Sequence, residues 1–129
     1  MQISLEDTKV ESLEIKQIDG EIDSDNFTLT FGTSFGDDLK TFLINFNLSL
    51  QSTDGFSLTI SYVAFFATDE EIDEVFKSSH FVKANAPAIA YPFLRSFIST
   101  VTVNAGFRAV LIPTVNFQAL SKLNTKEEI

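Results

Sequence analysis

The sequence offers few side chains that could carry out catalysis. His80 is the only histidine, and the chain has no cysteine, which excludes thiolate chemistry and sulfur-ligated metals. A Ser-His-acid triad would have to use His80, which lies in a predicted loop without a nucleophile-elbow motif. The five glycines are scattered and form no phosphate-binding loop. These residues therefore predict neither an enzyme nor a bound cofactor.

The densest group of acids lies near the middle of the chain. Its members are Glu70, Glu71, Asp73 and Glu74. A metal site needs oxygen ligands that converge on one point, whereas acids at the start of a helix commonly cap and solvate it. The stretch TDEE at residues 68–71 has the form of a capping box, and apolar residues follow at helical spacing. We therefore expect one or two short helical turns here rather than a metal site.

The charge of the chain is unevenly distributed. The net charge is −9, and sixteen of the eighteen acidic residues lie within residues 1–74. An acidic field of this kind repels the phosphates of nucleic acids and attracts basic partners. The charge therefore argues against a nucleic-acid partner. A second interpretation stays open, in which the acids form a solvated face that keeps an apolar protein in solution.

Phenylalanine is the unusual component of the composition. The chain has fourteen Phe, two Tyr and no Trp in 129 residues. Each ring stabilises the fold by about 1.5–3 kcal/mol when it is buried. This is more rings than one small core is expected to hide.

Three segments of the first half have the pattern of strands. Residues 27–31, 42–50 and 56–62 alternate apolar and polar side chains, which is typical of a strand with one buried face. Asp54-Gly55 lies between the last two segments and predicts a tight turn, so these segments should form a hairpin. The opening segment is less regular, and a strand there would need a bulge or break near Gln17.

The second half predicts one long helix that stops at Gly106. Pro87 suits the first turn, where its missing N–H has no partner to lose, and Pro92 should kink the helix. The β-branched stretch 99–103 leaves a strand as the alternative. The length of the pattern and its flanking stops favour the helix.

Apolar residues cover more than half of this helix. They form two ridges at i, i+4 spacing, Ile89, Phe93, Phe97 and Val101 in one and Ala90, Leu94 and Ile98 in the other. Arg95, Ser99 and Thr102 form a narrow polar face. Such a helix needs cover on two sides, and a single four-stranded sheet covers one. The other side should therefore meet another subunit or a ligand.

These patterns predict one α+β domain over residues 1–129. A four-stranded antiparallel sheet occupies about residues 3–67, a crossover segment residues 68–85, and a helical part with a long and a short C-terminal helix residues 86–123. The beginning, MQISLEDTK, has no basic segment followed by an apolar one, and no uncharged run is long enough to span a membrane. We expect a cytoplasmic protein without membrane insertion.

Two segments of the second half resemble the SecB family of protein-export chaperones. PAIAYPFLR resembles the helix motif of that family through Pro87, Ile89, Tyr91, Pro92, Phe93 and Arg95. GFRAVLIPTVNFQAL resembles the segment that follows it through Gly106, Phe107, Val110, Leu111, Ile112, Val115, Asn116, Phe117, Ala119 and Leu120. The resemblance covers residues 87–120 without a gap.

The resemblance implies an ATP-independent holdase. SecB-like proteins are dimers of dimers whose long helices pack between sheets, and they bind unfolded or precursor polypeptides in long apolar grooves. The residues that would line the groove are Tyr62, Phe65, Phe66, Phe76, Phe81, Ile89 and Phe93. Those expected at the oligomer interface are Arg95, Phe97, Ser99 and Val101. The clients would be export precursors or a dedicated client such as an antitoxin.

One implied contact concerns the SecA motor protein. The resemblance places a SecA-binding acid at Glu14 in the first strand. In the fourth strand, Thr59 stands where the family uses a glutamate. The sequence therefore leaves SecA open as a partner. Two alternatives to a chaperone also stay open, an oligomeric interaction domain and a carrier of small apolar ligands.

Overall fold

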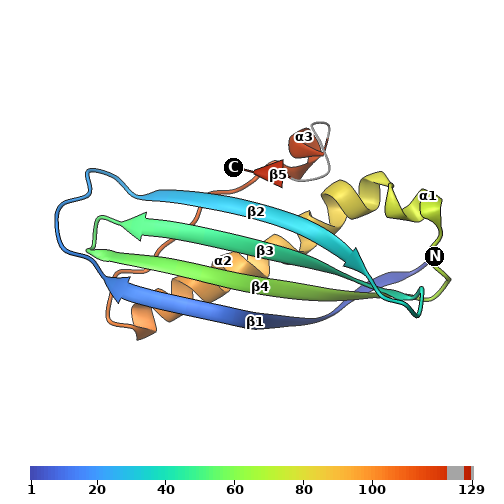
Figure 1. Cartoon of the computed structure of the whole chain (residues 1–129), viewed down its shortest axis with the longest axis horizontal. Coiled ribbons are helices and arrows are strands. Elements are labelled where there is room, and N and C mark those ends of the chain that lie inside the picture. Colours follow the sequence, from blue (N-terminus) through green and yellow to red (C-terminus); the bar gives the residue numbers. More distant parts are fainter. Residues whose placement is uncertain (122–126, 129) are drawn as a thin grey trace.

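The structure is a computed structural model that describes residues 1–121 and 127–128, and it contains one antiparallel sheet with helices on one side (Figure 1). The elements are β1 (Ile3–Gln17), β2 (Asn26–Phe35), β3 (Thr41–Ser52), β4 (Phe56–Thr68), α1 (Glu74–Lys77), the π-helical segment η1 (Phe81–Asn85), α2 (Ala86–Asn104), α3 (Phe117–Leu120) and β5 (Glu127–Glu128). The strand order is β1-β4-β3-β2-β5. The predicted α+β class is confirmed, with the two-residue β5 as an addition to the four expected strands.

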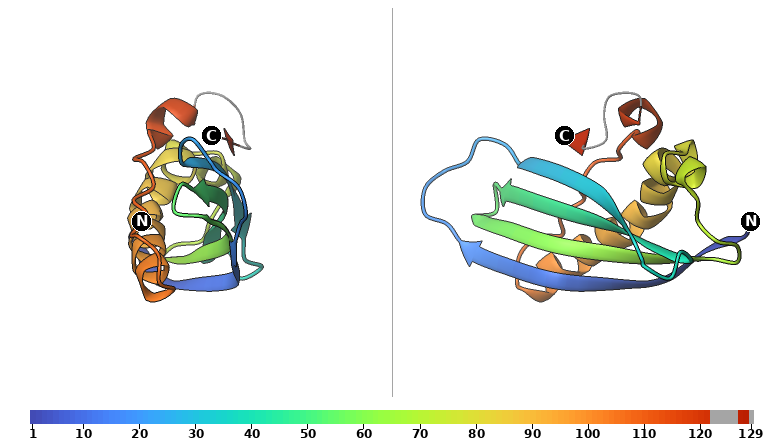
Figure 2. Two further views of the ribbon diagram at one scale, coloured as in Figure 1. Left: turned by 90° about the vertical axis from the view of Figure 1, so that its left-hand side faces the viewer. Right: turned by 45° about the vertical axis from the view of Figure 1, so that its right-hand side comes forward.

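The molecule has two layers, which the end-on view separates clearly (Figure 2). The helix α2 crosses one face of the sheet diagonally, and we call this face the inner face (Figure 1). Side chains of β3 alternate between the buried inner face and the exposed outer face. The outer face carries small polar side chains over much of its area, including Thr28, Thr30, Asn47, Ser49 and Thr59.

The predicted hairpin is present as β3 and β4. The two strands pair from Thr41↔Ala67 to Ser52↔Phe56 without a register shift. Gly55 adopts a φ of 87°, a left-handed conformation that glycine adopts without steric cost. The turn chemistry at Asp54-Gly55 was therefore enough to locate the hairpin.

β1 ends at Gln17, where the sequence predicted a bulge or break, and it has two further irregularities along its length. The register with β4 shifts between Leu5 and Asp7 and again between Val10 and Ser12, and the strand ends at Gln17. Each shift inserts one residue and reverses the parity of the strand, so apolar side chains of both parities reach the inner face. The bulge or break predicted near Gln17 is a break, because β1 ends there, whereas the two bulges inside the strand were not predicted.

The crossover segment differs from the prediction at two points. Asp73, rather than a residue of the 68–71 box, caps α1, because its side chain accepts a 2.8 Å hydrogen bond from the Phe76 N–H. Thr68 instead ends β4, and its hydroxyl donates to the Glu70 carbonyl at 2.7 Å. The expected loop before the long helix contains η1, whose final turn continues directly into α2.

The long helix α2 confirms the prediction of helix over strand for residues 99–103. Pro87 lies in its first turn, and the chain stays helical through Pro92. The helix ends in a Schellman motif at Gly106, where the Phe107 N–H bonds to the Thr102 carbonyl and the Gly106 N–H to the Val103 carbonyl. Residues 105–116 are not helical, so the predicted helical part is interrupted before α3.

Candidate functional site

One side of α2 is apolar and open. Ala90, Leu94 and Ile98 are completely buried against the sheet, as the ridge pattern predicted. The other predicted ridge is divided, because Phe97 and Val101 are half-buried in the core whereas Ile89 and Phe93 are 44% and 49% exposed. Val103 lies on the same exposed side, nearly three turns further along the helix. We call Ile89, Phe93 and Val103 the open stripe of α2.

A second side of α2 is covered by residues 106–116, which return along the helix and which we call the strap (Figure 1). Besides the two backbone bonds of the Schellman motif, three hydrogen bonds that involve side chains hold the strap to α2. They join Tyr91 Oη to the Pro113 carbonyl at 2.7 Å, Arg95 Nε to the Ile112 carbonyl at 2.9 Å, and the Val110 N–H to Thr102 Oγ1 at 3.2 Å. The predicted polar face of the helix is thus used within the subunit, and Thr102 is fully buried rather than exposed.

The environment of Tyr91 keeps its hydroxyl neutral. Burial raises the pKa of Tyr91 to about 12, and the positive charge of Arg95 only partly opposes this effect. A neutral phenol can donate its proton to the Pro113 carbonyl, which the deprotonated form cannot. Tyr91 therefore holds the strap through this hydrogen bond at neutral pH.

A row of phenylalanines follows β2, the strand next to the edge of the sheet. Phe27, Phe31 and Phe35 pair with inner-face residues of β3, so all three point to the inner face. They are four residues apart, which in a strand corresponds to about 13 Å between successive rings. Each ring belongs to a different apolar cluster. We call these three residues the edge row.

The first cluster surrounds Phe27 and contains a pocket of 190 Å³. The pocket lies between the start of β2 and the strap, and its lining residues are Asp25, Asn26, Phe27, Leu50, Gln51, Val110, Leu111, Ile112 and Pro113. Leu111 is 75% exposed, whereas Ile112 is buried. The strap therefore presents one apolar side chain to solvent at the rim of an apolar pocket.

The middle cluster surrounds Phe31. Phe117 of α3 lies edge-on to Phe31 at 5.1 Å between ring centroids and edge-on to Tyr91 at 5.4 Å. Phe46 completes the group at 6.2 Å from Phe31. Asn116 positions α3, because its side chain accepts a 3.0 Å hydrogen bond from the Ala119 N–H. The helix α3 thus covers the middle of the edge row.

The third cluster surrounds Phe35 and joins the sheet to the crossover segment. Its rings are Phe35, Phe42, Phe66, Phe76 and Phe81, and the Lys77 ammonium lies 5.5 Å from the centre of the Phe35 ring. Phe42 and Phe66 stack at 4.9 Å and are buried. Phe35, Phe76 and Phe81 are half-buried, so this cluster is accessible from the crossover side.

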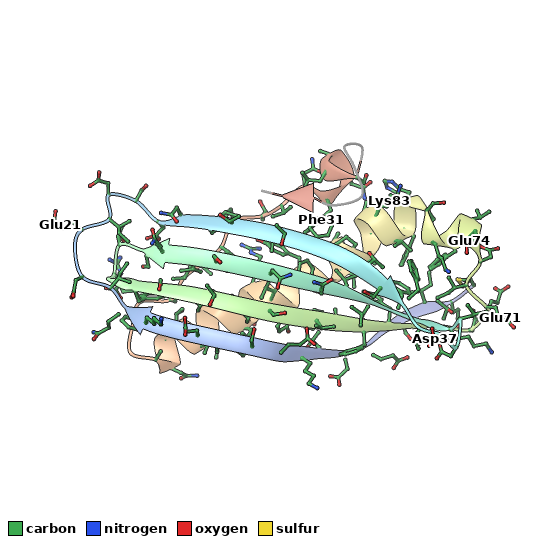
Figure 3. The ribbon with its side chains drawn as sticks, viewed as in Figure 1. Glu21, Phe31, Asp37, Glu71, Glu74 and Lys83 are labelled. Carbon is green, nitrogen blue, oxygen red and sulfur yellow. The ribbon has the colours of Figure 1, made fainter. Side chains whose placement is uncertain are left out.

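Charge is absent from the edge row, and acidic residues lie near both ends of β2. No residue of β2 is ionisable. Figure 3 shows Glu21 in the loop at one end of the sheet, and Asp37, Glu71 and Glu74 at the other end, with Phe31 between them. The site is therefore an apolar strip with acidic ends, which suits an apolar ligand that carries positive charge.

The structure brings together some of the seven predicted groove residues and separates others. Phe66, Phe76 and Phe81 share the third cluster. Tyr62 is buried beside Phe97 at 6.0 Å, inside the core. Phe65 lies on the outer face of the sheet, because it adjoins the inward-facing Phe66 in the same strand. Ile89 and Phe93 lie on the open stripe of α2.

The remaining predicted site residues lie at two places. Arg95, Phe97, Ser99 and Val101, which were expected at an oligomer interface, are half-buried beside the open stripe rather than on it. Glu14 is exposed on β1 and pairs with Thr59 of β4 on the outer face. The Glu14 carboxylate lies 3.5 Å from Lys16 Nζ. The outer face at this point therefore has its acid partly neutralised by a neighbouring cation.

Sequence reasoning missed the edge row and Phe117 as site residues. The alternating pattern of residues 27–31 predicted which side of the strand the phenylalanines occupy. It did not predict where that strand lies in the sheet. Only the strand order, in which β2 lies next to the two-residue β5, identifies β2 as the accessible side of the sheet. The sequence signal that could have found them is the repeat of phenylalanine at every fourth position, Phe27, Phe31 and Phe35, in an uncharged strand.

Comparison with known sequences points to one protein family. The model of the family described as "Preprotein translocase subunit SecB" matches residues 26–128. A protein-export protein SecB of Anaplasma phagocytophilum is 31% identical over 80 residues, which are 60% of this chain and 49% of that protein. An uncharacterised protein of Methanocaldococcus jannaschii is 38% identical over 60 residues, which are 46% of this chain and 37% of that protein. The chain spans about half the length or less of these relatives.

Comparison with solved structures shows the same fold. A SecB-like chaperone of Mycobacterium tuberculosis, in complex with a ChAD peptide from the HigA1 antitoxin, superposes with a TM-score of 0.67 at 10% identity and covers 88% of this chain and 89% of that one. A protein of unknown function from Streptococcus agalactiae gives a TM-score of 0.54 at 17% identity, over 88% and 98% of the two chains. Among the helices in the described part of the chain, none has the length and hydropathy needed to cross a membrane.

Proposed function

This chain belongs to the SecB family, and we propose that it is an ATP-independent holdase that binds unfolded polypeptides along the edge row. The observation that carries the proposal is the row itself, in which Phe27, Phe31 and Phe35 place three apolar clusters along one uncharged strand. An unfolded polypeptide offers apolar side chains and unpaired backbone groups. A strip of rings binds such a chain without requiring a particular sequence.

The proposal includes self-association through α2. The open stripe leaves Ile89, Phe93 and Val103 in contact with water, which is unfavourable for apolar side chains gathered on one helix. A second copy of the same helix would cover them. We propose a homotetramer built as a dimer of dimers, in which the open stripes pack against one another between the sheets.

The charge of the molecule should affect which unfolded proteins it binds. The ends of the edge row carry acids, so basic unfolded chains should be held in preference to acidic ones. The proposed clients are export precursors or one dedicated protein such as an antitoxin. Delivery of clients to SecA is less well supported, because the outer face has Glu14 but has Thr59 in place of a second acid.

A carrier of small apolar ligands is less well supported by the geometry. The apolar pocket beside Phe27 has a volume of 190 Å³, whereas sites for drug-sized ligands usually enclose about 300–1,000 Å³. Its rim also includes the exposed Leu111, so a ligand there would stay in contact with solvent. A chain that extends beyond the pocket along β2 would bury more apolar surface.

The proposal is tested by suppression of the aggregation of a reduced, unfolded model protein in the absence of ATP. We expect the wild type to suppress aggregation, and Leu111→Ser and Phe81→Ser to weaken this activity several-fold. Phe65→Ser is the matched control, because it removes a half-buried ring from the outer face. Leu111 is largely exposed, so its replacement should leave folding intact.

The outcomes separate the chaperone from its alternatives. A wild-type chain that forms an oligomer but holds no unfolded protein would favour the interaction domain. Loss of activity in Phe65→Ser with full activity in Leu111→Ser would move the binding surface to the outer face and contradict the proposal. Loss in Leu111→Ser and Phe81→Ser alone supports it.

A further inference from the structure

The chain itself already places a short strand on the edge of β2. β5 pairs antiparallel with β2, with Glu128 opposite Thr30 and Glu127 opposite Phe31. β2 has ten residues, and β5 is the only described strand on that side of it. The positions of β2 before Thr30 and after Phe31 have no strand partner there within the described residues. The edge therefore accepts an added strand and has room for a longer one.

We propose that β2 binds the extended backbone of a client as an added antiparallel strand, and that β5, as part of the same chain, is a tethered competitor for the same position. This inference rests on the proposed function, because it specifies how the client binds along the edge row. The added strand would supply backbone hydrogen bonds that do not depend on the client's sequence. The edge row would supply the apolar contacts.

The two outer long strands of the sheet differ in a way that favours β2 for this role. β1 has two bulges and carries the charged residues Glu6, Asp7, Lys9, Glu11, Glu14 and Lys16. β2 has no charged residue, and its pairing with β3 runs from Asn26 to Phe35 without a register shift. A regular, uncharged edge accepts the widest range of client sequences.

The geometry also predicts which clients bind best. In a strand added beside β2, alternate side chains point to the inner face, where the three clusters lie. Successive members of the edge row are four residues apart, so client residues at positions i, i+4 and i+8 would fall next to them. Apolar residues at this spacing should therefore be preferred over the same residues at a helical spacing.

The competitor occupies the middle of the edge row. Phe31, which pairs with β5, also contacts Phe117 of α3, so one turn of helix and one short strand together cover this position. Phe27 and Phe35 at the two ends remain half-buried. A client could therefore contact both ends first and displace two residues of β5 from the centre. Two residues of pairing are few enough to be displaced, although the tether keeps them at high local concentration.

The first test uses the full chain with both strand residues replaced. Glu127→Pro with Glu128→Pro removes the backbone donors that β5 needs, and Glu127→Gln with Glu128→Gln is the matched control that removes the charge but keeps the donors. Fluorescence anisotropy would measure the Kd for a labelled, reduced and carboxymethylated unfolded protein. We expect the proline pair to lower the Kd about three- to tenfold, since the apparent Kd rises as the competent fraction falls.

Each outcome of this test has one meaning. A lower Kd in the proline pair alone supports the tethered competitor. Equal Kd values in all three chains overturn it, as does the same gain in the glutamine pair, which would assign the effect to charge. Absence of binding in all three chains overturns the proposed function instead.

The second test addresses the added strand directly. Two peptides of equal composition, built from Ser, Thr and Lys with three Phe, would carry the Phe at positions 2, 6 and 10 or at positions 2, 5 and 9. The second arrangement places Phe on both sides of a strand, so at least one ring loses its cluster. We expect it to bind about tenfold more weakly, roughly the contribution of one ring. Equal affinity of the two peptides would overturn strand addition.

Discussion

The side of α2 that faces the sheet and the side that carries the open stripe are both apolar, but their surroundings are opposite. Leu94 is completely buried and Phe93, one residue earlier, is half exposed. The sheet has only one inner face, and the helix can lay only one side on it. The comparison teaches that the first side stabilises the subunit, whereas the second is available for association.

The side of α2 under the strap is intermediate between these two in how completely the rest of the subunit covers it. It is held by hydrogen bonds that involve the side chains of Tyr91, Arg95 and Thr102, together with the buried Ile112 of the strap. A net contribution of about 1 kcal/mol for each such bond is smaller than the contribution of a buried leucine. The three sides should therefore differ in how strongly a substitution destabilises the protein, with the largest loss on the side that faces the sheet.

The largest effect is expected on the sheet-facing side. Leu94→Ala would leave a cavity between α2 and the sheet and lower the free energy of unfolding by about 2–5 kcal/mol. Chemical denaturation followed by circular dichroism measures this change. Leu111→Ala is the control, because Leu111 is 75% exposed and its truncation should change the free energy by less than about 0.5 kcal/mol. Similar losses in both variants would remove the distinction between the two environments.

The next effect is expected where the strap meets the buried hydroxyl of Thr102. Thr102→Val would leave the Val110 N–H without its acceptor, at a cost of about 1–2 kcal/mol in the free energy of unfolding. Thr102→Ser keeps the hydroxyl and separates the hydrogen bond from the loss of a methyl group. Hydrogen exchange at Val110 should accelerate in the valine variant only. Unchanged exchange there would show that the strap is held by its other contacts.

A smaller effect, with a pH signature, is expected for Tyr91→Phe. Loss of the bond to the Pro113 carbonyl should lower the free energy of unfolding by about 1 kcal/mol. In the wild type, the pKa of Tyr91 is about 12 when folded and about 10 when unfolded. The unfolded chain therefore loses its proton first, and stability falls as the pH rises from 10 towards 12. Denaturation at pH 9 and pH 11 should show a steeper decline in the wild type than in Tyr91→Phe.

The smallest effect on the fold is expected on the open stripe, although its effect on assembly should be clear. Ile89→Ser with Phe93→Ser should leave the far-ultraviolet circular dichroism spectrum unchanged, because neither side chain is buried in the subunit. Light scattering should show a shift from an oligomer to a smaller species. Thr100→Ser, on the same exposed side, is the control. A double variant that keeps the wild-type mass would place the interface elsewhere.

The regular strands and the long helix were predictable because their patterns are local. The alternation in residues 42–50, the turn at Asp54-Gly55 and the stop at Gly106 each depend on neighbours in the sequence. The predicted hairpin and the end of α2 are therefore confirmed. β1 was predicted less well, because a bulge depends on how the partner strand pairs, and β4 pairs with β1 across a gap of some fifty residues.

The candidate site was predictable only in kind. An excess of Phe side chains indicated an apolar binding surface, and Phe66, Phe76 and Phe81 do share one cluster. The edge row was missed, since a strand pattern does not say whether the strand lies at the centre or at the edge of a sheet. The hydrogen bond of Arg95 could not be predicted, because its partner, the Ile112 carbonyl, lies seventeen residues away in an irregular segment.

By itself, the sequence determined the alternation of its strands, the helix between Pro87 and Gly106, and the excess of apolar rings over one small core. It also determined the acidic charge. The tertiary structure alone decided which rings lie along an accessible edge and which side of α2 the sheet covers. The physical reason is that periodicity assigns a side chain to a face of its own element, whereas exposure depends on the elements that pack against that face.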